Sequence, residues 1–380
     1  MEQTINRGLD GVYIDESTIC FIDGAKGQLI YAGYDIRELA GKASFEEVTY
    51  LLWHGHLPNR TQLDEFRRQL AHNFTLPEAV YQLFKALPKD AEPMLALHSA
   101  VALLGSFDSA ANGVDADNVQ RIGLRLLPQF PLLVAAFQRI RNGQEPVQPR
   151  ADLSVAGNFL YTLTGEEPTQ AATNVMDVAL VLHAEHGSNA STFVARATAS
   201  TLTDVYSAIG AAVGALKGPL HGGANTGVMN ALEKIGSIEA VEKYVMDILG
   251  KPGGRVMGFG HRVYKVLDPR AIILKDVSRA LAEESGDSKW FEMSLEMERV
   301  MDREMAKKGK EVKPNVDFFS ASVYRMLGFP ADMYTPIFAV ARIAGWMAHL
   351  YEQYADNRLM RPRLAYTGPV GKQFVPLDER

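Results

Sequence analysis

Apolar residues recur every three or four positions along most of the chain, which is the pattern of amphipathic helices. Helices are predicted in turn at residues 44–55, 61–74, 77–88, 92–107 and 118–143. The first opens with a capping box, Ser44 followed three residues later by Glu47, and is predicted to end at Gly55. The last contains Pro128 and Pro131. Because proline removes a backbone donor and clashes with the preceding turn, we expect that helix to be broken or kinked.

The second half of the chain alternates between apolar and charged stretches. Segments 168–187 and 190–218 are apolar nearly all round, which predicts buried central helices. From residue 225 to 314 the composition is far more charged, and it turns apolar again at 316–329 and 335–354. We therefore expect a large helical domain, residues 1–224 and 315–380, and a smaller inserted helical domain, residues 225–314.

Only the first forty residues have strand-like patterns. The runs "GVYID" (11–15), "TICFID" (18–23) and "GQLIYAG" (27–33) are short, rich in β-formers and separated by turn residues. They predict small hairpins that are too few to build a major sheet. The predicted fold class is mainly α, with two helical domains and small N-terminal β-hairpins.

Length and composition narrow the class of protein. A chain of 380 residues favours two domains, and a net charge of −6 argues weakly against nucleic acid as the main partner. The single cysteine, Cys20, rules out an internal disulfide and fits a reducing compartment. The start of the chain has no basic region followed by an apolar run, and apolar runs such as "VALVL" (178–182) are too short to span a membrane. We expect a cytoplasmic protein with neither a nucleic-acid nor a membrane partner.

Candidate chemistry lies in three histidine segments, each bordered by glycine or other small residues that allow a ligand close to the backbone. They are "HAEHGSNAST" (183–192), "GPLHGGAN" (218–225) and "GFGHRVYKVLDPR" (258–270). A fourth segment, "KPNVDFFSA" (313–321), places Asp317 between valine and two phenylalanines. A partly desolvated carboxylate of this kind is a better base than a solvated one, although Asp317 could also simply cap the following helix.

Simpler interpretations compete with a catalytic one. His183 and His186 lie one helical turn apart, but no cysteine or second carboxylate completes a zinc set, so no metal site is expected. The run "GRVMGFG" (254–260) lacks the third glycine and the preceding strand of a dinucleotide loop. The "HGH" run at 54–56 fits a helix cap, and His221 alone could belong to a helix corner.

Together with "ARIAGWMAH" (341–349) and "RPRLAYTG" (361–368), these segments resemble the citrate synthase family in order and rough spacing. The resemblance implies that His221 hydrogen-bonds the thioester oxygen of acetyl-CoA, and that the glycines beside it leave room for this ligand. It also implies that His261 polarises the oxaloacetate ketone while Asp317 takes the methyl proton. No metal or redox cofactor is implied, since acetyl-CoA is a substrate.

The resemblance also implies the binding residues. Oxaloacetate would contact four side chains, His186, Arg270, Arg342 and Arg361, because guanidinium groups suit its two carboxylates. Ser191 and Asn189 would lie behind them, with Ser191 orienting His221. Coenzyme A phosphates would meet a basic set, Lys265, Lys251 and Arg255. In this family an N-terminal extension accompanies a hexameric form, and because this chain lacks it we expect a homodimer.

Arg361 lies in a tail rich in proline and glycine, and such a tail is expected to run across a neighbouring subunit. The resemblance places a substrate-binding arginine of the partner subunit at this position, so it implies that Arg361 completes the other subunit's site. Two alternatives stay open at this point. One is a 2-methylcitrate synthase that uses propionyl-CoA, since one methylene in a pocket is worth only about 1–3 kcal/mol. The other is a non-catalytic helical dimer that only binds CoA or a dicarboxylate.

Overall fold

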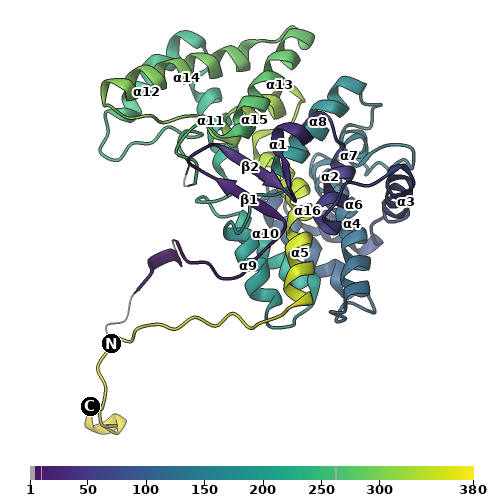
Figure 1. Cartoon of the computed structure of the whole chain (residues 1–380), viewed down its shortest axis with the longest axis vertical. Helices are drawn as coiled ribbons and strands as arrows, with labels where there is room; N and C mark the ends of the chain where they lie inside the picture. Colours follow the sequence, from purple (N-terminus) through teal and green to yellow (C-terminus); the bar gives the residue numbers. More distant parts are fainter. Residues whose placement is uncertain (1–4, 10, 262) are drawn as a thin grey trace.

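The computed structural model describes residues 5–9, 11–261 and 263–380. Outside them lie residues 1–4 and 10 of the N-terminal segment and Arg262 of the third histidine segment. Within the described residues the fold is a packed set of helices with one small sheet (Figure 1). The helices are α1 (Ile36–Leu39), α2 (Phe45–His54), α3 (Arg60–Ala71), α4 (Glu78–Ala86), α5 (Pro93–Ser106), α6 (Ala116–Arg141), α7 (Val155–Thr164), α8 (Gln170–His183), α9 (Ala190–Ala199), α10 (Val205–Leu216), α11 (Ala224–Ile235), α12 (Val241–Leu249), α13 (Pro269–Ser285), α14 (Lys289–Lys307), α15 (Val316–Met326) and α16 (Tyr334–Ala355). The prediction of a mainly α fold is confirmed.

The sheet is a short antiparallel meander of β1 (Cys20–Asp23), β2 (Gln28–Tyr31) and β3 (Tyr34–Asp35). Cys20 pairs with Tyr31 and Asp23 with Gln28, so the strands predicted at 18–23 and 27–33 are confirmed. The strand predicted at 11–15 is wrong, because these residues have no strand to pair with. Asp15 forms an ion pair with Arg196 of α9 instead.

The helix boundaries follow the predicted capping chemistry at α2, where Ser44 and Glu47 form the capping box and Gly55 ends the helix in the left-handed region. Of the break or kink predicted at Pro128 and Pro131, the break is wrong, because both prolines lie inside one helix, α6, while the kink stays a prediction. Each internal proline costs about 3 kcal/mol. Packing of the buried middle of α6 against α4, α5, α7 and α16 offsets that cost.

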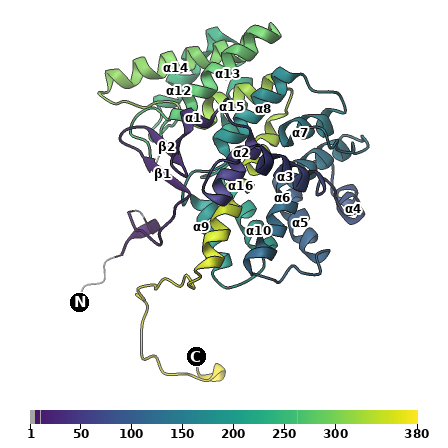
Figure 2. The same cartoon turned by 45° about the vertical axis from the view of Figure 1, so that its right-hand side comes forward.

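The core is organised around α16, which runs through the middle of the molecule (Figure 2). It packs against α2, α6, α8, α9 and α10, and its residues from Tyr334 to Leu350 are buried. The predicted buried helices at 168–187 and 190–218 appear as α8, α9 and α10, which lie against α16. No helix among the described residues is both long and apolar enough to cross a bilayer.

The charged stretch 225–314 forms α11 to α14, which gather at one end of the molecule (Figure 1, top). Helix α15, which we expected in the larger domain, packs against α11, α13 and α14 at this end of the molecule and carries Asp317 in its first turn. The boundary between two domains stays a prediction.

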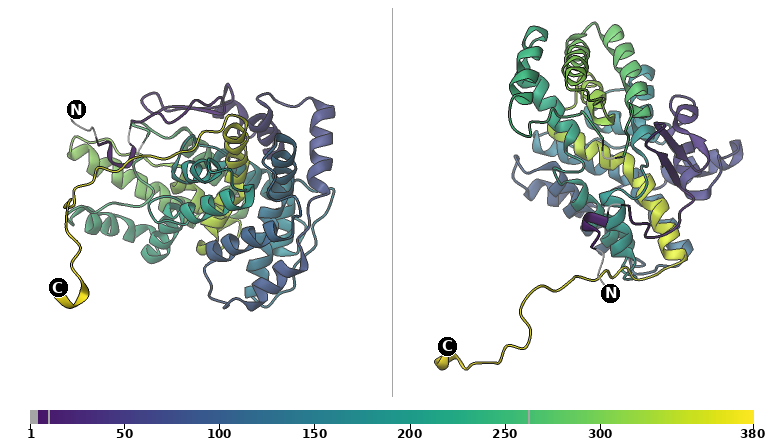
Figure 3. Two further views of the ribbon diagram at one scale, coloured as in Figure 1. Left: turned by 90° about the horizontal axis from the view of Figure 1, so that it is seen from below. Right: turned by 60° about the vertical axis from the view of Figure 1, so that its left-hand side comes forward.

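Beyond α16 the chain leaves the body of the protein and extends away from it (Figure 3). Residues 361–380 are all exposed, although several of their side chains are apolar. Leu364 is 97% exposed and Phe374 is 83% exposed.

Candidate active site

A cleft of about 750 Å³ brings together side chains that are far apart in the sequence. Six predicted site residues line it, namely His186, Asn189, His221, His261, Arg270 and Arg342. The N-terminal segment from Gly8 to Asp15 lines the same cleft at the described positions. The cleft thus lies where the loops before α9, α11 and α13 meet α16.

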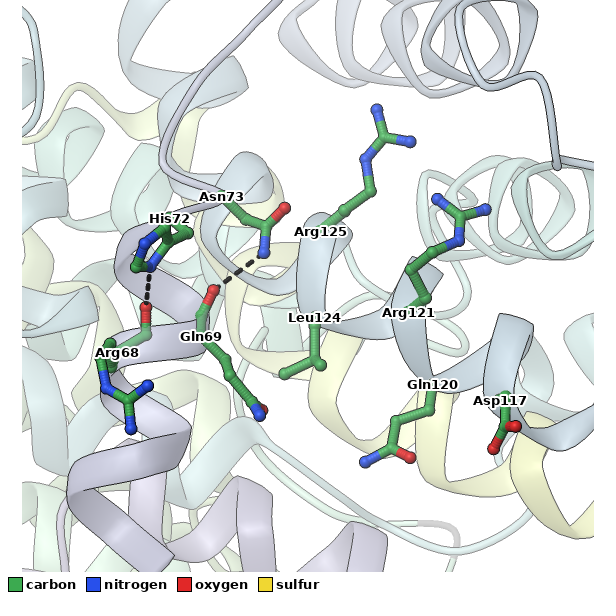
Figure 4. Close-up of a pocket in the computed structure, with 9 residues that line it drawn as sticks. All are labelled: Arg68, Gln69, His72, Asn73, Asp117, Gln120, Arg121, Leu124 and Arg125. Atoms are coloured by element: carbon green, nitrogen blue, oxygen red, sulfur yellow. Dashed lines mark hydrogen bonds between the residues drawn. The ribbon is translucent and has the colours of Figure 1, made fainter.

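A second hollow of about 690 Å³ lies between α3 and α6 and is also lined by basic side chains, among them Arg68, Arg121 and Arg125 (Figure 4). Each of these arginines already has an acidic partner, since Arg121 and Arg125 share Asp108 at 2.9 Å and Arg68 pairs with Glu65. The first cleft differs because several of its titratable groups have strongly shifted pKa values, which is typical of functional sites.

His261 and His186 lie face to edge in the cleft, with ring centroids 5.3 Å apart. The backbone N–H groups of Val263 and Tyr264 donate to His261 Nδ1 at 2.9 and 3.2 Å. Burial and the nearby Arg270 charge lower the pKa of His261 to about 4, so the ring is neutral near pH 7. With Nδ1 accepting, the proton of the neutral ring is on Nε2, which makes Nε2 a donor.

His221 is fixed from one side by the start of α9. The Ser191 backbone N–H donates to His221 Nε2 at 3.2 Å, and Ser191 Oγ lies 2.8 Å from the same nitrogen. Ser191 Oγ also contacts Asn189 Oδ1 at 2.8 Å and accepts from Trp346 Nε1 at 3.1 Å. Burial and the Arg342 charge lower the pKa of His221 to about 4. The backbone donor assigns the proton of this neutral ring to Nδ1.

The packing of its own loop requires a glycine at position 222, next to His221. A Cβ on Gly222 would lie 2.5 Å from the Leu216 carbonyl oxygen, and Gly222 N donates to that oxygen at 2.9 Å. This contact gives Gly222 a structural reason of its own, and the expectation that the glycines beside His221 leave room for a ligand stays a prediction. Gly222 lets the loop close tightly onto the end of α10, and this tight turn holds His221 opposite Ser191.

The two arginines of the cleft are buried and held differently. Arg270 forms a bidentate pair with Asp268, with Nε–Oδ1 and Nη2–Oδ2 distances of 3.0 and 2.8 Å. Burial opposes ionisation of Asp268, but the charge and hydrogen bonds of Arg270 outweigh it and lower the pKa of this carboxyl. Arg342 donates from Nε to the His183 carbonyl at 2.8 Å, whereas its Nη1 is buried without a partner among the described residues. Arg342 therefore has a donor to spare for an anion.

Asp317 lies at the second position of α15, and the helix is capped by Asn315, whose side chain accepts from the Asp317 N–H at 3.0 Å. The interpretation of Asp317 as the cap is thus wrong. Its Oδ1 is buried and, within the described part of the chain, has no hydrogen-bond partner. Burial raises its pKa to about 7 although Arg270 and Arg342 lower it. Asp317 does not line the cleft itself, but it is close enough for the charges of both arginines to lower its pKa.

Besides Asp317 and Ser191, four predicted residues do not line the cleft. Arg361 is exposed in the tail, and the three basic residues predicted for CoA are exposed and do not line the cleft, namely Lys251, Arg255 and Lys265. Lys265 is nevertheless near, since its charge contributes to the lowered pKa of His261.

Sequence reasoning missed several residues of the site. Asp268 could have been found, because Asp-Pro at a helix start marks an N-cap and the carboxylate is two residues from Arg270. Tyr264, whose hydroxyl lies 3.2 Å from His186 Nε2, carried no comparable pattern. Neither did Phe338, whose ring lies 4.8 Å from the Arg342 guanidinium carbon, nor the segment from Gly8 to Asp15.

The fold and the cleft define a mainly helical enzyme with neutral histidines and two buried arginines around one cavity and a carboxyl of raised pKa close to it. Among the described residues no group of three or more histidine, cysteine, aspartate or glutamate side chains is arranged to hold a metal ion. The family model "Citrate synthase, C-terminal domain" matches residues 8–363. The chain belongs to the citrate synthase family.

Relatives and solved structures agree with this assignment. "Citrate synthase 2" of Bacillus subtilis is 50% identical over 99% of this chain and 100% of its own length. "2-methylcitrate synthase 2" of Corynebacterium glutamicum is 40% identical over 99% and 98%. A ternary complex of carboxymethyl coenzyme A and oxaloacetate with citrate synthase from Thermoplasma acidophilum matches with a TM-score of 0.94 and 33% identity over 100% of both chains. The expected family, fold class and enzyme class are confirmed.

Proposed function

We propose that this citrate synthase condenses acetyl-CoA with oxaloacetate and hydrolyses the resulting thioester, so that acetyl-CoA, oxaloacetate and water give citrate and CoA. The observation that carries the proposal is one cavity lined by two neutral imidazole donors and two buried guanidinium groups, with a carboxyl of raised pKa close by. A thioester methyl is a very weak acid. Its deprotonation therefore needs a base on one side and a hydrogen-bond donor on the oxygen.

Three residues carry the chemistry in this proposal. Asp317 takes a proton from the methyl group, while His221 Nδ1–H donates to the thioester oxygen as negative charge develops on it. His261 Nε2–H donates to the ketone oxygen of oxaloacetate and then to the alkoxide. The carbon nucleophile attacks that ketone carbon to give citryl-CoA, and water then breaks the thioester bond and releases CoA.

Oxaloacetate binds through its carboxylates in this proposal. Arg342 offers its unpaired Nη1, Arg270 lines the same cleft, and the His186 ring has the Tyr264 hydroxyl 3.2 Å from its Nε2. Burial and the Arg270 charge lower the pKa of His186 far below its usual value, so the ring serves as a neutral hydrogen-bonding group. The phosphates of CoA would meet Lys265, with Lys251 and Arg255 further out.

The base is tested by Asp317→Asn, which keeps the shape of the side chain but cannot accept the methyl proton. We expect turnover to fall about 10²–10⁴-fold with oxaloacetate affinity largely retained. The readout is thiol release from acetyl-CoA with oxaloacetate present. A folded variant with near-normal turnover would remove Asp317 from the mechanism. No thiol release by the unsubstituted protein would favour the rival in which the chain only binds CoA or a dicarboxylate.

Propionyl-CoA is the alternative acyl donor, favoured by the 40% identity to a 2-methylcitrate synthase. The higher identity to a citrate synthase, 50%, favours acetyl-CoA. Comparison of kcat/KM for the two thioesters decides between them, and a higher value with propionyl-CoA would overturn our choice.

We also propose a homodimer, in the cytoplasm, in which Arg361 completes the other subunit's site. The extended tail with its exposed Leu364 and Phe374 supports this, because apolar side chains at that density need a surface to cover them. Mixing inactive Arg361→Ala and Asp317→Asn subunits under exchange conditions tests it. If Arg361 acts across the interface, the heterodimer has one intact site and activity reappears. If it acts within its own subunit, the mixture stays inactive.

The cleft between the large helical domain and the proposed inserted domain is expected to close over the substrates, which would exclude water until citryl-CoA has formed. Asp317 is then carried toward the cavity, since α15 packs with the helices of the charged stretch. Solution scattering should detect compaction with oxaloacetate and a non-reactive CoA analogue. An unchanged radius of gyration would contradict closure.

A further inference from the structure

Three buried polar atoms, one on the proposed base and two on nearby side chains, have no hydrogen-bond partner in the described part of the chain. They are Asp317 Oδ1, the Tyr324 hydroxyl and His183 Nε2. Leaving a buried polar atom unpaired costs about 1–3 kcal/mol, so three of them in one region need an explanation. None of the steps proposed above uses Tyr324 or His183.

Tyr324 links the other two groups, since it shares α15 with Asp317 and its ring lies near that of His183, the last residue of α8. Tyr324 follows Asp317 by seven residues in α15, which places both on one face of the helix two turns apart. A helical tyrosine leans toward the N-terminus, so its hydroxyl reaches back toward Asp317. Burial raises the pKa of the Tyr324 phenol, and the nearby Asp317 carboxylate raises it further. The ring centroids of His183 and Tyr324 are 6.3 Å apart.

The donors and acceptors of this group can be assigned. His183 Nδ1 lies 2.8 Å from the Ala179 carbonyl oxygen, which can only accept, so Nδ1 carries a proton. Burial lowers the pKa of His183 to about 3, so the ring is neutral and Nε2 is an acceptor. The ionised Asp317 is a second acceptor, and the Tyr324 hydroxyl is a donor. One water molecule, with two protons to give and a lone pair to receive, satisfies all three.

We propose that Tyr324 and His183 hold one internal water against the buried Oδ1 of Asp317, and that this hydrogen-bonded group positions the base. The inference rests on the proposed role of Asp317. Tyr324 donates to the water, which donates to Asp317 Oδ1 and to His183 Nε2. Donation to the carboxylate stabilises its ionised form, which keeps the base charged at a pH where burial alone would protonate it.

The test is the acid limb of the pH profile of kcat/KM for acetyl-CoA. In Tyr324→Phe the donor that fixes the water is lost, so the limb should move up by about one pH unit. The charged groups that face Asp317 from the neighbouring elements are unchanged in this variant, namely Asp268 and Arg270 of the α13 start and Arg342 of α16. A shift therefore reports the loss of the hydroxyl.

Tyr351→Phe is the matched control, because the Tyr351 hydroxyl is also buried and unpaired in the described structure but burial is the one cause of its raised pKa. Its acid limb should stay in place. A limb that is unmoved in folded Tyr324→Phe overturns the proposal, and so does an equal shift in both variants. His183→Asn keeps the donor toward the Ala179 carbonyl and removes the Nε2 acceptor, so its limb should also move up.

A crystal structure gives a direct second measurement. Ordered solvent within about 3.2 Å of all three atoms supports the proposal, and a well-ordered site without it overturns the proposal. Failure of the proposal for the internal water can be distinguished from failure of the proposed function. An inactive Asp317→Asn together with an unmoved limb in Tyr324→Phe overturns the water alone, whereas an active Asp317→Asn overturns the base.

Discussion

Substitution of Asp268 by asparagine should weaken the fold and at the same time tighten the binding of oxaloacetate. Asp268 and Arg270 form a bidentate pair in which the side chains are 0% and 2% exposed. Asp268 also accepts from the backbone N–H groups of Arg270 at 3.0 Å and Val316 at 3.3 Å. Asparagine keeps one acceptor oxygen but leaves the buried guanidinium without a counter-charge.

The magnitude follows from the burial of the pair. Removing one partner of a buried ion pair costs about 3–5 kcal/mol, and the retained oxygen places Asp268→Asn near the lower end. If oxaloacetate offers Arg270 a carboxylate, binding recovers part of that loss, because the apo variant alone holds an unpaired charge. The gain in affinity has an upper limit of about 100-fold for 3 kcal/mol.

Urea unfolding with and without oxaloacetate, together with calorimetric titration of oxaloacetate, measures both effects. Asp276→Asn is the matched control on the same helix, because Asp276 pairs with Arg279 at 3.0 Å but both side chains are exposed. It should cost less than about 1 kcal/mol and leave the affinity unchanged. If Asp268→Asn loses stability but its Kd for oxaloacetate is unchanged or weaker, Arg270 holds the fold and does not bind the substrate.

Three further predictions concern the same region. The pKa of Asp317 is raised to about 7, whereas the pKa values of His221 and His261 lie near 4. Therefore kcat/KM should fall tenfold per pH unit below about pH 7, and not only below pH 5. A flat profile down to pH 5 would contradict this. Ser191→Ala removes the hydroxyl beside His221 Nε2 and should lower kcat about tenfold with oxaloacetate KM unchanged, so a change confined to KM would argue against a role in orienting His221. Gly345→Ala would force a Cβ onto Glu185 Oε2 and the Ala184 carbonyl and should cost at least about 1–3 kcal/mol in urea unfolding; wild-type stability would show that this helix contact is loose.

The sequence by itself determined most of the secondary structure and the chemically important positions. Apolar periodicity gave α2 to α5 and the buried helices α8, α10 and α16, and capping residues gave the ends of α2. These features are local, because a helix depends on residues within one or two turns. His186, His221 and His261 could be singled out for the same reason, since the small residues around each lie next to it in the chain.

Tertiary structure decided what depends on distant partners. The strand predicted at 11–15 fails because strand formation needs a neighbouring strand, and Asp15 pairs with Arg196 instead. The α6 helix continues through two prolines because packing around it offsets their cost in free energy.

The electrostatics of the site also depend on packing. Local sequence gave Asp317 two phenylalanine neighbours. However, its pKa near 7 depends on the balance between burial and the charges of Arg270 and Arg342, which come from α13 and α16. The tautomers of His221 and His261 are set by backbone donors. The pairing of Ser191 with His221 spans 30 residues, so the fold that joins the start of α9 to the loop after α10 had to be known before the proton could be placed.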